Sequence, residues 1–366
     1  MTGRSASQHP SRRLVATGGL ALLSGCDAQP TAAAAPSAGP PPALREIAPF
    51  PVGTCVYVQQ LDDTLVAPLI ARQFSQVTPE WQMKMEVILK DDGTFDFGPA
   101  DRIAAFARAH GQRLYCTTLV WFAQDPVAFK VLDGNPAAFA AGLRRYIQAV
   151  VGRYAGQAVG WDVVNETVED DGSGIRKSMW SRNLGEIDHM LMAFALAHEA
   201  DPRAVLFLND YGLELLPKKR LAFLRLVETL LKRGCKLGGL GTQSHLSVDN
   251  TQPGACRQTL AELARFGLPI HVSELDVSLG RRKLDLRSPA EKLKLQTARA
   301  VEMAQAFHDL PPQQRFAFTM WGARDSDSWL KREPNAGDGT DAPLLFDVNG
   351  APKPLFTAVS NALSRA

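Results

Sequence analysis

Several patterns that identify other classes of protein are missing from this chain of 366 residues. Beyond the N-terminal segment no stretch approaches 18 uninterrupted apolar residues, and we therefore expect no transmembrane helix in the body. No C-x-x-C pair is present, which argues against a zinc ribbon. The net charge is only +2 and no basic patch is visible, which gives no support for a nucleic-acid partner.

Cysteine is scarce, with five residues in the chain. Cys26 belongs to the N-terminal segment. Cys55 and Cys116 lie inside apolar, strand-like runs, and we expect them to be buried thiols. If an exported protein oxidises a pair, Cys235 and Cys256 are the candidates.

The N-terminus carries the features of an export signal. Basic residues that include Arg12-Arg13 precede a short apolar run, and the pattern resembles a twin-arginine signal only in part. Leu23-Ser24-Gly25-Cys26 resembles a bacterial lipobox, in which the cysteine is lipidated; the alternative is a plain signal peptide with a chance cysteine. We therefore predict a signal peptide over 1–26 and an extended Ala/Pro-rich linker over 27–45. The protein is expected to be exported to the periplasm or cell surface, with a lipid anchor on Cys26 as its sole link to the membrane.

The body, residues 46–366, alternates short apolar runs with amphipathic stretches. Strands are predicted near 52–58, 82–88, 113–120, 158–164, 204–208, 237–242, 269–274 and 315–320. The clearest helices are predicted over 101–110, 136–154, 184–200, 218–233 and 288–308. Eight such strands favour an α/β fold, a single (β/α)₈ TIM barrel. A doubly wound open sheet is the alternative, but it usually carries a Gly-rich phosphate turn after the first strand, and none is visible.

Polar and aromatic side chains gather where five consecutive predicted strands end. The segments are Trp161–Glu166, Asn209–Tyr211, Gln243–His245, Ser273–Asp276 and Trp321-Gly322. Active sites of α/β barrels lie at the carboxyl ends of the strands. Stability alone does not readily explain so many carboxylates, amides and indoles at one end of a barrel.

Glu166 and Glu274 form the central pair of this hypothesis. An isolated glutamate after a strand is usually a helix cap or a solvated charge, but each of these two ends an apolar strand, where an unpaired charge is costly. Strands 4 and 7 lie across a barrel mouth from each other. Two carboxyl groups about 5–5.5 Å apart give retaining glycoside hydrolysis, with one as nucleophile and the other as acid and then base. Mutual repulsion raises the pKa of one of them, which the acid role requires.

Supporting residues can be proposed around this pair. We expect His245 to hydrogen-bond Glu274 and Asp276 to orient His245, although a satisfied core histidine is the alternative. Trp121, Trp321 and Trp329 offer flat faces on which sugar rings stack, although core packing explains some of the six tryptophans. His245 is the single histidine at a strand end, which disfavours a metal-dependent hydrolase. We predict no metal and no cofactor.

These motifs resemble those of glycoside hydrolase family 10, the β-1,4-xylanase family, over roughly residues 50–360. The resemblance rests on W-D-V-V-N-E, N-D-Y, Q-S-H, S-E-L-D and the segment from Trp321 to Trp329 that includes Asp325 and Ser328. It implies Glu166 as acid/base, Glu274 as nucleophile and Asn165 as a partner of the sugar 2-hydroxyl. It further implies substrate-binding or supporting roles for Glu80, Lys84, Asn209, Tyr211, Gln243 and His245. The expected activity is double-displacement hydrolysis of β-1,4-xylan or a related β-glycan by a monomer.

The chain departs from the family pattern on the glycone side. Trp81 and Met85 stand where the family has Asn and Trp, and Thr117 and Phe122 stand where it has His. Gly212 replaces an Asn. Loss of hydrogen-bonding groups and gain of bulk change substrate ranking, and our hypothesis is that linear xylan is a poor substrate relative to a substituted glycan, a short oligosaccharide or a glycoside with an apolar aglycone. The alternatives are a retaining β-glycosidase with a non-xylan substrate and a catalytically silent sugar-binding lipoprotein.

Overall fold

The computed structural model describes residues 42–280 and 284–364. The predicted signal peptide, the lipobox with Cys26 and most of the linker therefore lie outside the described residues. The chain from Pro42 onward forms one compact unit. Its first helix, α1 (Leu44–Ile47), buries Leu44, so the folded domain begins a few residues before the predicted boundary at 46.

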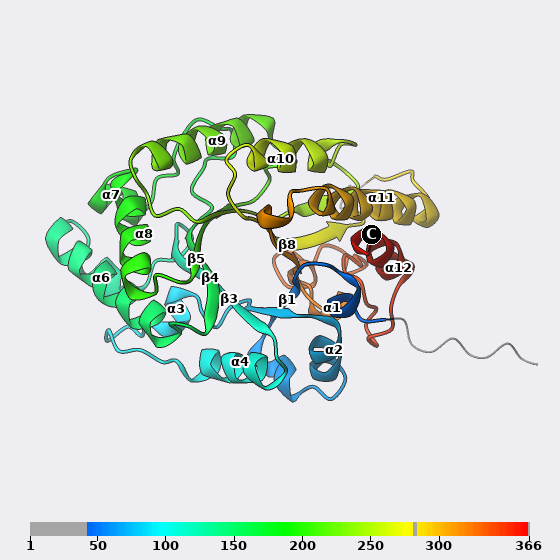
Figure 1. The fold of residues 1–366 in the computed structure, drawn as a ribbon, viewed down its shortest axis with the longest axis horizontal. Coiled ribbons are helices and arrows are strands. Elements are labelled where there is room, and N and C mark those ends of the chain that lie inside the picture. Colours follow the sequence, from blue (N-terminus) through cyan, green and yellow to red (C-terminus); the bar gives the residue numbers. More distant parts are fainter. Residues whose placement is uncertain (1–41, 281–283, 365–366) are drawn as a thin grey trace, which may run out of the picture. The chain divides into compact units, whose positions relative to one another are not determined.

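Eight parallel strands close into a barrel, as the sequence predicted (Figure 1). In chain order the strands are β1 (Val52–Val56), β2 (Gln76–Pro79), β3 (Arg113–Trp121), β4 (Ala158–Asn165), β5 (Val205–Asp210), β6 (Gly239–Thr242), β8 (Ile270–Ser278) and β9 (Arg315–Met320). Each pairs with the next, and β9 pairs with β1 to complete the ring. A short strand, β7 (His245–Ser247), adds to the far end of β8.

The second strand is the one element that the sequence misplaced. The apolar run at 82–88 was predicted as a strand, whereas β2 lies at Gln76–Pro79 and Met85–Ile88 forms the one-turn helix α3. Met83, Met85 and Ile88 are all buried. Polar and apolar residues alternate over 82–88, which is typical of a strand, but the stretch is too short for its period to exclude the single helical turn that forms here.

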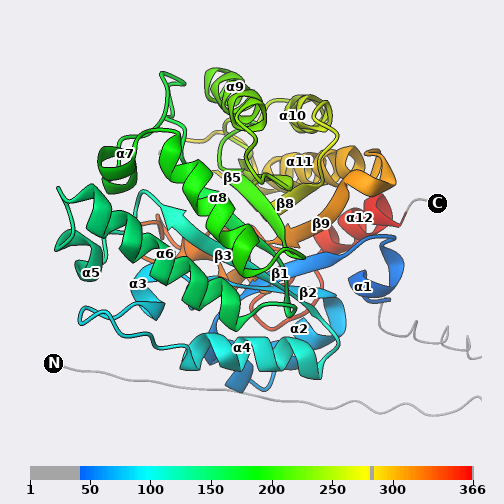
Figure 2. The ribbon, with the colours of Figure 1, turned by 60° about the vertical axis from the view of Figure 1, so that its left-hand side comes forward.

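Helices cover the outside of the barrel (Figures 1 and 2). They are α2 (Val66–Gln73), α4 (Gly98–Ala109), α5 (Val127–Lys130), α6 (Pro136–Arg153), α7 (Met179–Leu184), α8 (Asp188–Ala200), α9 (Pro217–Lys232), α10 (Ala255–Ala264), α11 (Pro289–His308) and α12 (Pro354–Leu363). Four 3-10 turns complete the set: η1 (Val58–Asp62), η2 (Pro312–Gln314), η3 (Asp325–Asp327) and η4 (Trp329–Lys331). The helix predicted from 184 starts instead at Asp188, because Gly185 ends α7 at a φ of 90°. Among the described residues, none of these helices has both the length and the apolar character needed to cross a membrane.

The lower half of the barrel interior is filled with aromatic and polar side chains. Tyr115 donates a 2.5 Å hydrogen bond from its hydroxyl to Asp162. His271 packs edge-on against Tyr115, with ring centroids 4.3 Å apart. Burial lowers the pKa of His271 well below its usual value, and the Arg113 charge acts in the same direction. This layer closes the barrel from below, so that a substrate can approach the polar residues only from the carboxyl ends of the strands.

The four cysteines in the described part of the chain are free thiols. Cys55 and Cys116 are buried, as expected. The suggested pairing of Cys235 with Cys256 is wrong. Cys235 follows the C-terminal end of α9 and Cys256 lies in the first turn of α10, and these two helix ends lie at opposite ends of the barrel.

Candidate active site

The predicted polar residues meet at one end of the barrel because every barrel strand runs in the same direction. Asn165 ends β4, and Glu166 follows it. Asn209 lies near the end of β5, and Gln243 follows β6. Glu274 and Asp276 lie in the last half of β8, beside His245 in β7. The sequence placed Asn165, Glu166, Asn209 and Gln243 at strand ends correctly. The predicted strand 269–274 extends instead to Ser278, so Glu274 lies at the middle of β8, and the closed parallel barrel makes it a neighbour of the others.

Glu166 adopts a backbone conformation that is rare for a residue with a side chain, with φ at 55°. Its Oε1 accepts hydrogen bonds from Gln243 at 2.9 Å and from Asn165 at 3.1 Å. Its Oε2 accepts one from the indole Nε1 of Trp121 at 2.8 Å. Burial raises the pKa of Glu166, and the nearby charge of Glu274 adds to the rise, while the bonds from Gln243 and Trp121 oppose it. The raised pKa favours the protonated form of the carboxyl group, which a general acid requires.

Glu274 belongs to a second network of contacts, which runs through His245 to Asp276. His245 brings its Nε2 to 3.3 Å from Glu274 Oε2 and its Nδ1 to 3.0 Å from Asp276 Oδ2. The indole of Trp329 donates a 2.7 Å bond to the same Asp276 oxygen. Burial alone would lower the pKa of His245, but the carboxylates of Asp276 and Glu274 more than reverse this and raise the pKa to about 10. The imidazole is therefore positively charged at neutral pH and supports Glu274.

A pair of amides connects the two glutamates. Asn165 donates to Glu166 and accepts from Asn209 Nδ2 at 3.0 Å, and Asn209 Nδ2 also donates to Glu274 Oε1 at 3.2 Å. Three hydrogen bonds through two asparagine side chains therefore connect the carboxyl group of Glu166 with that of Glu274. Gly241 makes room for this bridge, because a Cβ there would lie 2.2 Å from Asn209 Oδ1.

Tyr211 and Trp321 were predicted at the same site but hold different positions. The hydroxyl of Tyr211 donates to Asp170 at 2.6 Å and lies beside Arg176, on the loop that follows Glu166. Trp321 is buried beside His245, with ring centroids 6.4 Å apart. Within the described residues, neither side chain is hydrogen-bonded to Asn165 or Asn209.

Glu80 and Lys84 follow β2, and Lys84 contacts the same Trp121 indole that donates to Glu166. The ammonium of Lys84 lies over two indole rings, 4.5 Å from the centre of Trp121 and 4.7 Å from that of Trp81. Such cation–π contacts stabilise the ammonium at a partly exposed position. Burial raises the pKa of Glu80 to about 8, and the charge of Lys84 opposes the rise.

Three residues of this region escaped the sequence analysis. Arg176 donates from Nε to the backbone carbonyl of Glu166 at 3.2 Å and lies over the ring of Phe122, and so it braces the unusual backbone of Glu166. Tyr57 and Arg332 both contact Glu80. No local pattern marks them, because their partners lie 10 to 252 residues away in the chain.

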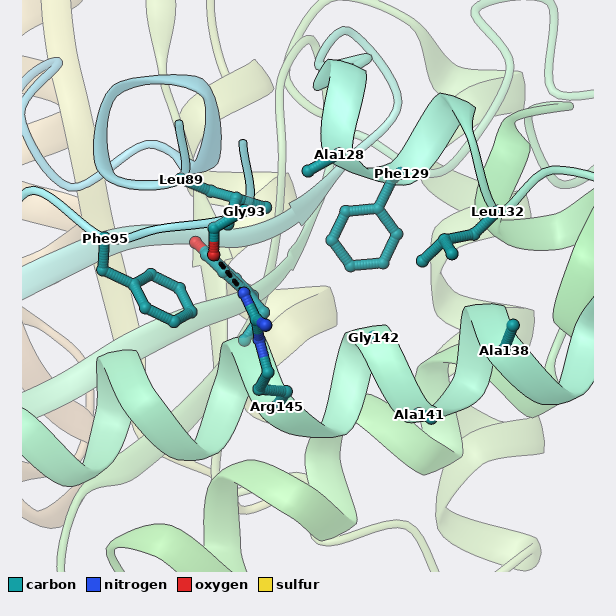
Figure 3. A pocket seen from close by; sticks show the side chains of 11 residues that line it. Leu89, Gly93, Phe95, Ala128, Phe129, Leu132, Ala138, Ala141, Gly142 and Arg145 are labelled. Carbon is teal, nitrogen blue, oxygen red and sulfur yellow. Dashed lines mark hydrogen bonds between the residues drawn. The ribbon is translucent and has the colours of Figure 1, made fainter. Parts of the chain in front are cut away.

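The described residues contain no group of three or more His, Cys, Asp or Glu side chains that could hold a metal ion. A depression of about 280 Å³ beside His245, Asp276 and Trp329 adjoins the site. The pocket in Figure 3, of about 340 Å³, lies elsewhere, on the outer surface at α5 and α6. There Arg145 reaches the carbonyl of Gly93 across the apolar lining, and none of the predicted site residues contributes.

Comparison with known proteins places this arrangement in a family. The pattern of "Glycosyl hydrolase family 10" matches residues 44–362. The chain is 36% identical over 316 residues to endo-1,4-beta-xylanase B of Paenibacillus barcinonensis, covering 84% of this chain and 93% of that protein. It is 35% identical over 324 residues to beta-1,4-xylanase of Dictyoglomus thermophilum, covering 86% and 89%. The structure of a thermostable mutant of a xylanase from Cellvibrio japonicus superposes with a TM-score of 0.80 at 32% identity, over 88% of this chain and 100% of the other. The chain belongs to glycosyl hydrolase family 10.

Proposed function

We propose that the protein is a retaining endo-1,4-β-xylanase, with Glu274 as nucleophile and Glu166 as acid/base. The observation that carries this proposal is the amide bridge from Glu166 through Asn165 and Asn209 to Glu274, which holds two carboxyl groups of different environment around one point. The relatives named as xylanases support xylan as the substrate class. A silent sugar-binding lipoprotein and a β-glycosidase for another glycan are not favoured.

The first step forms a bond between a carboxylate oxygen of Glu274 and the anomeric carbon while the glycosidic bond breaks. Glu166 gives its proton to the departing sugar oxygen. The charged imidazole of His245 stays on Glu274 Oε2 and fixes its orientation. Asn209 holds the other oxygen, which limits the rotation of the carboxylate during attack.

In the second step water replaces the departed sugar. Glu274 is now an ester and carries no negative charge, which removes the repulsion that raised the pKa of Glu166. Glu166 takes a proton from the water as its oxygen attacks the anomeric carbon, and Glu274 leaves as a carboxylate. Two inversions give net retention.

The test is hydrolysis of xylan and of a panel of aryl β-glycosides by the domain from residue 42 onward, with the anomer of the first product followed by NMR. We expect the first product from xylan and from aryl β-xylosides to have the β-anomeric configuration. Inverted products would overturn the assignment of Glu274 as nucleophile. A folded domain that binds xylooligosaccharides and hydrolyses none would favour the sugar-binding alternative.

We further infer that the protein is exported, anchored through a lipid on Cys26 and monomeric. The support for the anchor is the sequence Leu23–Cys26 and the Ala/Pro-rich segment after it. Labelling of the full chain with a radioactive fatty acid should mark the protein and not Cys26→Ser. Release of the unmodified protein into the soluble fraction would contradict the anchor, and light scattering of the domain would test the monomer.

A further inference from the structure

Three donors already engage the carboxyl oxygens of Glu80. Its Oε1 accepts from the Tyr57 hydroxyl at 2.7 Å and from Arg332 Nη2 at 3.0 Å. Its Oε2 accepts from the Cys55 thiol at 3.4 Å and again from Arg332 Nη2 at 3.2 Å. An ionised carboxylate offers about four lone-pair sites, and a protonated one offers fewer. Glu80 therefore holds other side chains in place, whereas the family resemblance implied that it binds the glycone.

Arg332 is the side chain that Glu80 holds. Its guanidinium lies over the ring of Tyr57, with the central carbon 4.4 Å from the ring centre, and Nη2 also donates to the carbonyl of Asp327 at 2.8 Å. The side chain is 41% exposed, against 7% for Glu80. Within residues 42–280 and 284–364 no hydrogen bond from Nε or Nη1 is found. Donors on two of its nitrogens are thus oriented in advance and open to solvent.

Lys84 presents a second cation to the same region. Its ammonium is held by the indoles of Trp81 and Trp121, and in the described part of the chain it forms no ion pair. Glu80 is the acid that acts on both cations, and it is buried. This end of the cleft therefore presents cationic donors where the family pattern led us to expect a carboxylate acceptor.

We propose that Arg332, assisted by Lys84, binds the carboxylate of a uronic acid attached to the glycone part of the substrate. This inference rests on the proposed xylanase function and names the decoration that the site selects. Guanidinium groups form charge-assisted hydrogen bonds with carboxylates, and a preorganised arginine loses less freedom on binding. Neutral sugar hydroxyls could pair with the same donors, but they would gain nothing from the positive charges of Arg332 and Lys84, both of which act on Glu80.

The experiment compares two forms of one polymer: glucuronoxylan, and the same glucuronoxylan after reduction of its carboxyl groups to alcohols. We expect the wild-type protein to hydrolyse the acidic form with a kcat/KM about tenfold higher, the scale of one charge-assisted hydrogen bond. The preference should fall as salt is raised from low ionic strength to 0.5 M. Equal rates on the two polymers would overturn the inference.

Variants then locate the effect. Arg332→Gln should bring the ratio of the two rates close to one, and Arg332→Lys should retain part of it. The matched control is Lys331→Gln, which removes one positive charge from the residue next to Arg332, at the end of η4, where the ammonium donates to the carbonyl of Gly339. The control should keep the wild-type ratio, and an equal loss in it would show long-range attraction in place of a site.

Failure of the proposed function can be told apart from failure of this inference. A wild-type protein that hydrolyses neither polymer contradicts the xylanase assignment. Calorimetry with Glu274→Gln and an acidic xylooligosaccharide would still report the site, because binding does not need hydrolysis. Tighter binding of the acidic oligosaccharide than of its carboxyl-reduced form, lost on adding Arg332→Gln, supports the inference; equal binding overturns it.

Discussion

Glu274, Glu166 and Glu80 lie at one end of the barrel, Glu274 and Glu80 buried and Glu166 half-buried, yet they differ in how their oxygen lone pairs are used. Among the described residues Glu274 accepts from two donors, Asn209 and His245. Glu166 accepts from three neutral donors, whereas the three donors on Glu80 include Arg332, whose Nη2 contacts both carboxyl oxygens. A carboxylate that attacks carbon or transfers a proton must keep a lone pair free, whereas one that anchors other side chains need not. Under the proposed function, Glu274 and Glu166 are therefore the reacting groups, and Glu80 orients Arg332 at the glycone end of the site.

The largest expected effect comes from changing Glu274, the proposed nucleophile in this comparison. Glu274→Gln keeps the shape of the side chain but removes the nucleophilic oxygen and its charge, and the single amide oxygen can accept from only one of the two donors, Asn209 or His245. We expect a loss of kcat on the order of 10⁴-fold or more, the scale seen when a nucleophile is removed from other hydrolases. Steady-state hydrolysis of xylooligosaccharides measures it. Residual activity within tenfold of the wild-type protein would move the nucleophile elsewhere.

Glu166→Gln should cost less, and by an amount that depends on the leaving group. General acid catalysis contributes roughly 10²–10⁴-fold. We expect that loss with xylan, whose departing sugar needs a proton, and a much smaller loss in the first step with a nitrophenyl xyloside, whose leaving group departs without one. Pre-steady-state release of nitrophenol separates the steps. The same loss on both substrates would argue against the acid role.

Asp276→Asn tests the charged His245. In the native protein the pKa of His245 is raised to about 10 from an ordinary 6.5. The stabilisation by its charge is therefore full below about pH 6.5 and is lost as the pH rises through about 10. Removing the Asp276 charge should cost about 2 kcal/mol near neutral pH and flatten the pH dependence of unfolding. Urea unfolding between pH 6 and 10 measures both, and an unchanged pH profile would contradict the charged imidazole.

Trp81→Asn gives the smallest expected effect and sharpens the glycone side. It restores the residue type that the family pattern carries, removes an exposed indole and frees Lys84 from one cation–π contact of about 0.5–1 kcal/mol. We expect a two- to fivefold rise in kcat/KM for linear xylooligosaccharides, measured against Trp81→Phe, which keeps an aromatic ring. A fall with Asn but not with Phe would mean that Trp81 itself stacks on the sugar.

Much of the catalytic centre could be predicted because its residues lie in short segments at strand ends. A strand that ends in Asn165-Glu166, or that contains Glu274 and Asp276, needs only the rule that parallel strands end together for its side chains to meet. The same reasoning failed at 82–88, where polar and apolar residues alternate as in a strand but Met85–Ile88 forms one helical turn. It also failed for the suggested Cys235–Cys256 pair, because spacing along the chain does not say at which end of the barrel a helix terminus lies.

The sequence by itself determined the barrel, the two glutamates and the support that His245 and Asp276 give to Glu274, since each follows from local pattern and strand order. Only the tertiary structure decided the charge of His245 and the role of Glu80. The pKa of an imidazole depends on which carboxylates contact it: the pKa of the partly buried His245 is raised beside Asp276 and Glu274, and that of the fully buried His271 is lowered. Likewise Arg332 reaches Glu80 across 252 residues of chain, and no local signal records that three side chains already donate to the Glu80 carboxyl group.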